Sequence, residues 1–162
     1  LLSVLSSVYG FVSPYILQAK RLFQLTVRRK LDWDEEIPQD IEEQWARGKN
    51  DLPTLSEMKI QRCLKPKQDL VQPVTAQLHH FADASEQGLG AVSYLRVTDG
   101  SGGTHCSLVM SKSKLAPLKA TTIPRLDLVA AVVATRLDKR IRQHLEMPLL
   151  ESVFLTDSLL VL

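Results

Sequence analysis

The stretch LHHFADAS, residues 78–85, predicts a β-strand that ends on a carboxylate. Leu78 and His80 fall on one face and Asp83 on the other, as the period of two of a strand requires. The residues directly after Asp83 are small and turn-prone. An acid placed where a strand opens into a turn is in contact with solvent and with any ligand that docks there.

Two further acids have comparable positions. Asp127 lies at the start of a long apolar helix, and Asp157 lies at the end of an apolar strand. Taken alone, Asp127 has an ordinary structural explanation, because an acid near a helix N-terminus stabilises the helix dipole. Three acids at element ends, brought to one edge by the topology, favour a shared site instead.

Regular elements follow one another from residue 75 onward. We expect strands at 76–83, 89–97 and 104–111, a helix at 124–145 and a strand at 152–157. Short links predict an antiparallel meander of the first three strands, and the helical crossover predicts that the fourth strand lies parallel to the first. The helix carries an apolar stripe at steps of three and four: Leu126, Val129, Val133, Leu137, Ile141 and Leu145. An adjacent stripe of small residues, Ala130, Ala131 and Ala134, would let the helix approach the sheet closely. The fold class is therefore α/β, a mixed sheet with a helix on one face.

The N-terminal part of the chain is predicted to be mainly helical. A first helix occupies much of residues 1–30, with Ser13 before a proline as its start signal. A second, acidic helix runs from about 38 to 49, with Ile41 and Trp45 four residues apart as apolar anchors.

Prolines and mixed polar residues indicate a linker at 64–76. We therefore divide the chain into a helical segment, residues 1–74, and a sheet domain, residues 75–162. The 162 residues carry a net charge of +2, which is too weakly basic to indicate nucleic-acid binding by itself. No apolar run reaches the roughly 18 residues of a membrane span. The last four residues are all apolar, so we expect a piece of a longer polypeptide.

Clustered carboxylates repel one another unless a cation lies among them. Asp83, Asp127 and Asp157 are thus candidate metal ligands and catalytic residues. Mg²⁺ prefers such oxygen ligands, and two ions about 3.5–4 Å apart can activate water and stabilise the leaving oxygen in phosphodiester cleavage. The sequence contains no zinc-type Cys or His cluster and no glycine-rich phosphate loop. We therefore predict a site for two Mg²⁺ ions, which Mn²⁺ could also occupy.

Four short motifs lie around these acids: FADAS at 81–85, KSKLAP at 112–117, TIPRLDL at 122–128 and TDS at 156–158. Together they resemble the ribonuclease H region of the BEL/Pao class of LTR retrotransposon polyproteins. The N-terminal half resembles the connection segment that joins reverse transcriptase to ribonuclease H in those polyproteins.

The resemblance implies a ribonuclease H-like fold and metal-dependent hydrolysis of the RNA strand in RNA–DNA hybrids. Asp83 would bridge both metal ions, while Asp127 and Asp157 would complete the shell of one. The implied partners are the hybrid and the adjacent reverse transcriptase domain, and the implied location is a cytoplasmic virus-like particle. Implied nucleic-acid contacts are Ser85, Lys112, Lys114, Lys119 and Ser158, although each lysine is equally well explained as a solvated surface side chain.

The sequence departs from the family's pattern in three places. The helix carries Asp127 where the family usually has Glu, and Tyr9-Gly10 lacks three residues of the usual Tyr-Asp-Pro-Leu-Gly. The family also needs a fourth acid or a histidine on a later helix. We therefore expect little hydrolysis by residues 1–162 alone.

Two alternative functions stay open. A retroviral-like aspartic peptidase of the Pao type would need an Asp-Thr-Gly or Asp-Ser-Gly loop, and the residues after Asp83 and Asp157 lack that glycine. The other alternative is a non-catalytic spacer that positions the hybrid for the polymerase.

Overall fold

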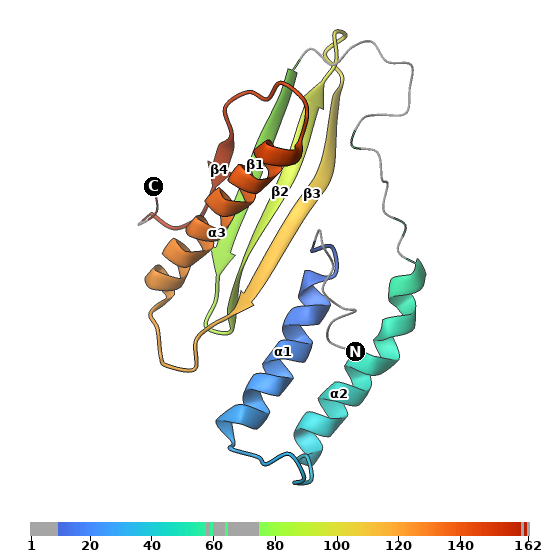
Figure 1. The fold of residues 1–162 in the computed structure, drawn as a ribbon, viewed down its shortest axis with the longest axis vertical. Coiled ribbons are helices and arrows are strands. Elements are labelled where there is room, and N and C mark those ends of the chain that lie inside the picture. The colour runs from blue at the N-terminus through green and yellow to red at the C-terminus, as the bar shows by residue number, and fades with distance from the viewer. Residues whose placement is uncertain (1–9, 58, 60–63, 65–74, 160, 162) are drawn as a thin grey trace.

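The computed structural model describes residues 10–57, 59, 64, 75–159 and 161 (Figure 1). The first elements are the helices α1 (Ser13–Arg28) and α2 (Gln39–Asp51) and the short 3-10 helix η1 (Leu52–Glu57). They are followed by β1 (Thr75–Ala84), β2 (Gly88–Thr98), β3 (Thr104–Leu115), α3 (Ile123–His144) and β4 (Val153–Leu155). The predicted domain boundary at residue 74 lies outside the described residues.

The four strands form one mixed sheet in the order β3-β2-β1-β4. β2 is antiparallel to both β1 and β3, and β4 runs parallel to β1. The Asp99 carboxylate closes the β2–β3 turn by accepting hydrogen bonds from the N–H of Ser101 at 2.9 Å and of Gly103 at 2.7 Å. A link this short joins antiparallel neighbours, whereas the α3 crossover makes parallel pairing possible. The predicted α/β fold class is confirmed.

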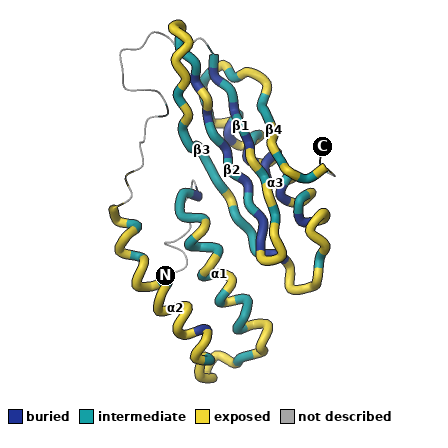
Figure 2. The backbone as a smooth tube through the Cα atoms, turned by 180° about the vertical axis from the view of Figure 1, so that it is seen from behind, coloured by how far each residue is buried: buried dark blue, intermediate teal, exposed yellow. Residues whose placement is uncertain are grey.

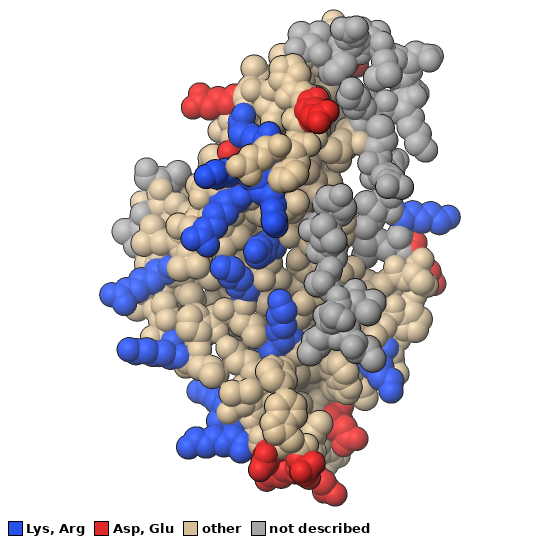
Figure 3. All heavy atoms as spheres, viewed as in Figure 1, with Lys and Arg blue, Asp and Glu red and all other residues tan. Residues whose placement is uncertain are grey.

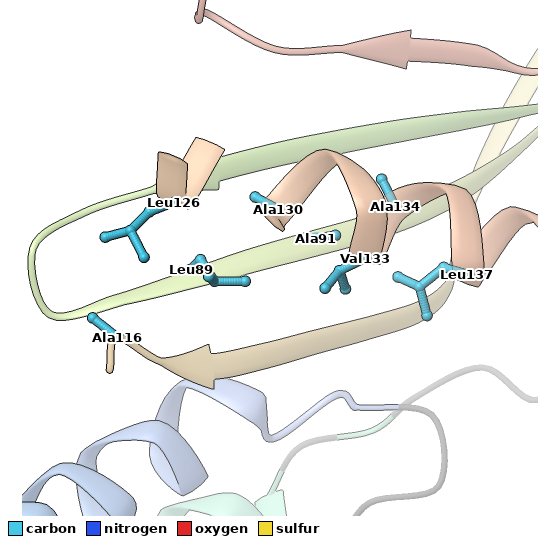
Figure 4. Close-up of a cluster of buried hydrophobic side chains, with 8 residues drawn as sticks. All are labelled: Leu89, Ala91, Ala116, Leu126, Ala130, Val133, Ala134 and Leu137. Atoms are coloured by element: carbon cyan, nitrogen blue, oxygen red, sulfur yellow. The ribbon is translucent and has the colours of Figure 1, made fainter. Parts of the chain in front are cut away.

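The main core lies between α3 and the sheet (Figure 4), and its buried members are Leu89, Ala91, Ala116, Leu126, Ala130, Val133, Ala134 and Leu137. Val129, which the apolar stripe placed in the core, is 42% exposed, so this part of the prediction is wrong. Ala130 and Ala134 of the adjacent small-residue stripe are only 0% and 1% exposed, as expected of residues that face the sheet. Small side chains at the contact let the helix backbone approach the sheet closely, and the helix is rotated accordingly.

α1 packs against β3 on the side of the strand away from α3, whereas burial is concentrated in β1, β2 and α3 (Figure 2). Ser111 Oγ donates a hydrogen bond to the carbonyl of Gly10 at 2.6 Å, and Gln24 Nε2 donates to the carbonyl of Ala116 at 2.8 Å. Gly10 has φ +79°, and a Cβ there would lie 1.8 Å from the carbonyl oxygen of Ser111. The contact between α1 and the sheet therefore requires glycine at this position.

α2 packs against α1. Ile41 is buried at 3% exposure, as predicted, but Trp45 is 45% exposed, so its predicted role as an anchor is wrong. Contact with a single neighbouring helix covers only a narrow stripe of α2, and Ile41 fills it. An exposed ion pair between Arg29 and Asp40, at 2.7 Å, links the two helices. None of the helices in the described ranges is long and apolar enough to cross a membrane.

Candidate acidic site

Asp83 is the penultimate residue of β1 and is exposed to solvent. Its Oδ1 accepts a hydrogen bond from the N–H of Ala84 at 2.7 Å, which holds the carboxylate at the start of the turn into β2. Because side chains alternate along a strand, Asp83 shares the face of Phe81, opposite the buried Leu78 and His80. The carboxylate is therefore accessible from the face of the sheet that α3 does not cover.

Asp157 comes to the same edge of the sheet through the parallel register of β4. Phe81 is paired with Leu155, and Asp83 and Asp157 each follow these partners by two residues. Both acids line one open cleft of about 870 Å³, which the sheet forms with the first turns of α1. The structure thus brings two of the three predicted acids together.

Asp127 is the fifth residue of α3, which begins at Ile123, so it lies in the second turn rather than in the predicted first turn. It precedes Asp138 by eleven residues, or about three turns, so the two acids share one flank of the helix. Asp138 contacts His80 of β1, and this flank therefore faces the β1–β4 side of the sheet. Asp127 is not among the residues that line the cleft of Asp83 and Asp157.

The donor set of the cleft agrees only partly with a magnesium site. Carboxylate oxygens such as those of Asp83 and Asp157 are the ligands that Mg²⁺ takes. In the described part of the chain, however, no group of three or more acidic, histidine or cysteine side chains is placed to hold a metal ion. The predicted site of three carboxylates for two metal ions stays a prediction, and two of its carboxylates, Asp83 and Asp157, line the cleft.

The predicted nucleic-acid contacts are spread over two faces. Ser85 Oγ donates a hydrogen bond at 3.1 Å to the carbonyl at the start of β2, so its hydroxyl closes the turn next to Asp83. Ser158 is partly buried and directly follows Asp157. Lys112 and Lys114 lie on β3, and Lys119 is exposed in the loop before α3. The serines therefore belong to the acidic edge. Of the lysines, Lys112 also lines the acidic cleft, whereas Lys114 and Lys119 do not.

A buried polar network joins β1 to α3, and no local sequence pattern predicts it. His80 is 0% exposed; its Nδ1 lies 2.7 Å from Ser93 Oγ and its Nε2 lies 3.0 Å from Asp138 Oδ1. A carboxylate only accepts hydrogen bonds, so Nε2 carries the proton and Nδ1 accepts from the Ser93 hydroxyl. Burial lowers the pKa of His80, and the neighbouring Asp138 opposes this only in part, so the ring is neutral.

Asp138 extends this network toward β4. It accepts hydrogen bonds from Ser152 Oγ and from Arg142 Nε, the latter at 3.0 Å. Burial raises the pKa of Asp138, but the hydrogen bonds from Ser152, Arg142 and His80 outweigh it and leave the pKa below its ordinary value. In the sequence, Asp138 is recognisable only as an acid four residues before Arg142, at the edge of the apolar stripe. That spacing does not identify the partners of Asp138 on other elements.

The order Ser93–His80–Asp138 resembles that of a serine hydrolase triad. Ser93 and His80 are both 0% exposed, however, so no substrate can reach the hydroxyl. The network is therefore a structural link between strand and helix.

The chain matches a known family. Residues 1–158 match the family described as Pao retrotransposon-like RNaseH-like domain. The chain belongs to this family. The match confirms the resemblance to Pao retrotransposon polyproteins, and the mixed sheet agrees with a ribonuclease H-like fold. A comparison with curated proteins finds no match.

In this Pao-family domain, the three acid-bearing motifs all lie at the ends of regular elements. FADAS ends β1, TIPRLDL begins α3 and TDS follows β4. The match also spans α1 and α2, so the family's domain includes the helices that precede the sheet.

Proposed function

We propose that this domain is the ribonuclease H of a retrotransposon Pol polyprotein and that it cleaves the RNA strand of RNA–DNA hybrids. One observation carries the proposal: Asp83 and Asp157 share an open cleft at the ends of two parallel strands. In a chain of the Pao RNaseH-like family, paired exposed carboxylates at this edge are suited to magnesium-dependent phosphodiester hydrolysis.

In this proposal Asp83 and Asp157 hold magnesium, and Asp127 supplies a further carboxylate from the flank of α3 that faces β1. Magnesium, when bound, activates the attacking water and stabilises the leaving oxygen. Ser85 keeps the β1–β2 turn closed and so fixes the backbone that carries Asp83. A protein contact to the 2′-hydroxyl would account for selection of the RNA strand.

Positive side chains in and beyond the cleft are proposed to bind the phosphates of the hybrid. Lys119 is exposed in the loop that leads into α3, and Lys112 lines the acidic cleft. Each phosphate that a lysine neutralises releases a condensed counterion, so binding should weaken as salt is raised. The reverse transcriptase domain of the same polyprotein, in a cytoplasmic particle, would deliver the hybrid.

The test compares Pol polyprotein carrying this domain with its Asp83→Asn variant, on an RNA–DNA hybrid labelled on both strands. We expect magnesium-dependent cutting of the RNA strand only, and loss of that cutting in Asp83→Asn. The control is Asp34→Asn, which removes an equal charge from the exposed loop between α1 and α2 and should cut normally.

Undiminished cleavage by Asp83→Asn would show that the assignment is wrong. Peptide cleavage without hybrid cleavage would support an aspartic peptidase, and tight hybrid binding with neither activity would support a spacer.

A further inference from the structure

A second hollow, of about 250 Å³, lies between α3 and β3. Its lining consists of four cations and two apolar residues: Lys112, Lys114, Val133, Arg136, Leu137 and Arg140. Lys and Arg side chains gather over α3 and the neighbouring part of β3 on this face of the molecule (Figure 3). We call this hollow the basic groove.

Strand and helix periodicity together build the basic groove. Lys112 and Lys114 are two residues apart and so project from the same side of β3, the edge strand of the sheet, where Lys112 is exposed and Lys114 is half-buried. Arg136 and Arg140 are four residues apart and share one flank of α3. Asp138 is two residues from each arginine and so points to the opposite flank, where it contacts His80. The helix thus presents arginines toward β3 and its acid toward β1.

The four cations of the basic groove are not neutralised by neighbouring acids. None of them forms an ion pair with a carboxylate in the described ranges, whereas Arg142 on the same helix pairs with Asp138. The whole chain carries a net charge of only +2, so this is a local concentration of charge. Like charges gathered around one hollow repel each other, and an anion relieves that repulsion.

We infer that the basic groove binds the phosphodiester backbone of a nucleic-acid strand, outside the acidic cleft. The lysine pair and the arginine pair each span about 6–7 Å along their elements, comparable to the separation of neighbouring phosphates in one strand. A row of charges from two elements therefore fits an extended polyanion better than a single phosphate. Arginine also binds phosphate oxygens in a bidentate manner.

Binding of nucleic acid in the basic groove does not require hydrolysis. Arg136 and Arg140 join the lysines that the sequence predicts as nucleic-acid contacts. The inference rests on the proposed function only in choosing nucleic acid among polyanions. The groove and the acidic cleft both include Lys112 in their lining, so the two hollows adjoin at this residue.

The test measures the affinity of the full chain for a fluorescent RNA–DNA hybrid over a range of salt concentrations, without divalent metal. The double variant Arg136→Gln/Arg140→Gln loses two phosphate contacts. The fall of log K with log salt should therefore become less steep, by about two units of slope. The control, Arg47→Gln/Lys49→Gln, makes the same charge change at exposed positions on α2 and should keep the wild-type slope. Arg136→Lys/Arg140→Lys should retain most of the slope, because it keeps both charges.

An unchanged slope in the glutamine variant, or an equal loss in the α2 control, would overturn the inference. A competition assay with inorganic phosphate gives a second check. If free phosphate competes as well as an equal concentration of the hybrid's phosphates, the groove is a single-phosphate site and the inference is overturned. This assay contains no divalent metal and measures binding alone, whereas the nuclease proposal is tested by metal-dependent cleavage, so failure of the nuclease proposal and failure of the groove are distinguishable.

Discussion

His80 on β1 and Asp138 on α3 are joined by a hydrogen bond of 3.0 Å, which ties the strand that carries Asp83 to the helix that carries Asp127. The same imidazole stacks on Phe154 of β4, with ring centroids 4.7 Å apart. One buried side chain therefore contacts β1 and α3, which carry Asp83 and Asp127, and also β4, which Asp157 follows by two residues. The relative positions of those acids depend on this contact.

Removal of the Asp138 carboxylate should destabilise the fold. In Asp138→Ala, the buried N–H of His80 loses its acceptor and Arg142 loses its ion-pair partner, so we expect the free energy of unfolding to fall by about 1–3 kcal/mol. Urea denaturation measures it. The control, Lys139→Ala, changes an exposed neighbour on α3 and should stay within about 0.5 kcal/mol of wild type. An equal effect in both variants would contradict the role of the network.

Stability should decrease with acid because the pKa values of His80 and Asp138 are both lowered in the folded state. The unfolded chain then binds more protons than the folded one as the pH falls. The contribution of His80 is complete above its ordinary pKa of about 6.5 and is lost as the pH falls from there through its lower folded value. The contribution of Asp138 is complete above a pH of about 4 and is lost below it. Urea midpoints measured between pH 8 and pH 3 should show both losses.

The His80→Gln variant separates the two losses of stability. It should lack the loss that begins near pH 6.5, because glutamine does not titrate. If the variant and the wild type have the same pH dependence between pH 7 and pH 5, His80 does not cause it.

Gly10→Ala should detach α1 from the sheet. The new Cβ would lie 1.8 Å from the carbonyl oxygen of Ser111, and φ is +79° at this position, so we expect a loss of about 1–3 kcal/mol. Thermal denaturation and the rate of proteolysis within α1 measure it. Gly48→Ala is the matched control, since no atom lies within 4 Å of its added Cβ and alanine favours a helix interior by about 1 kcal/mol. The two alanines should therefore act in opposite directions, and a stabilising Gly10→Ala would refute the packing argument.

Asp127→Glu should raise cleavage by the Pol polyprotein, or lower the magnesium that cleavage requires. The backbone of α3 fixes the position of residue 127, so glutamate extends the carboxylate by one carbon–carbon bond. Magnesium requires near-octahedral ligands at about 2.0–2.1 Å and tolerates a retracted ligand poorly. Manganese, which is less strict in geometry, should narrow the difference. If cleavage by the two versions depends on magnesium concentration in the same way, Asp127 is not part of the site.

Local sequence pattern determined much of this protein. The alternation in residues 78–85, the turn residues after Asp99 and the helical spacing from Leu126 onward predicted the elements, and short links with one crossover predicted their order. These signals are readable because they depend on neighbours within a few residues along the chain. The position of Asp83 at the end of β1 also followed from them.

Tertiary packing decided the rest. Periodicity tells which residues share a face of α3, but only contact with the sheet fixes the rotation of the helix, and close packing at Ala130 turned Val129 outward. That rotation directs Asp138 to His80 and Arg136 toward Lys112. The register of β4 on β1, which brings Asp157 to Asp83, is likewise set by pairing between residues more than seventy positions apart. Such pairings depend on the whole packed arrangement, so no local stretch of the sequence encodes them.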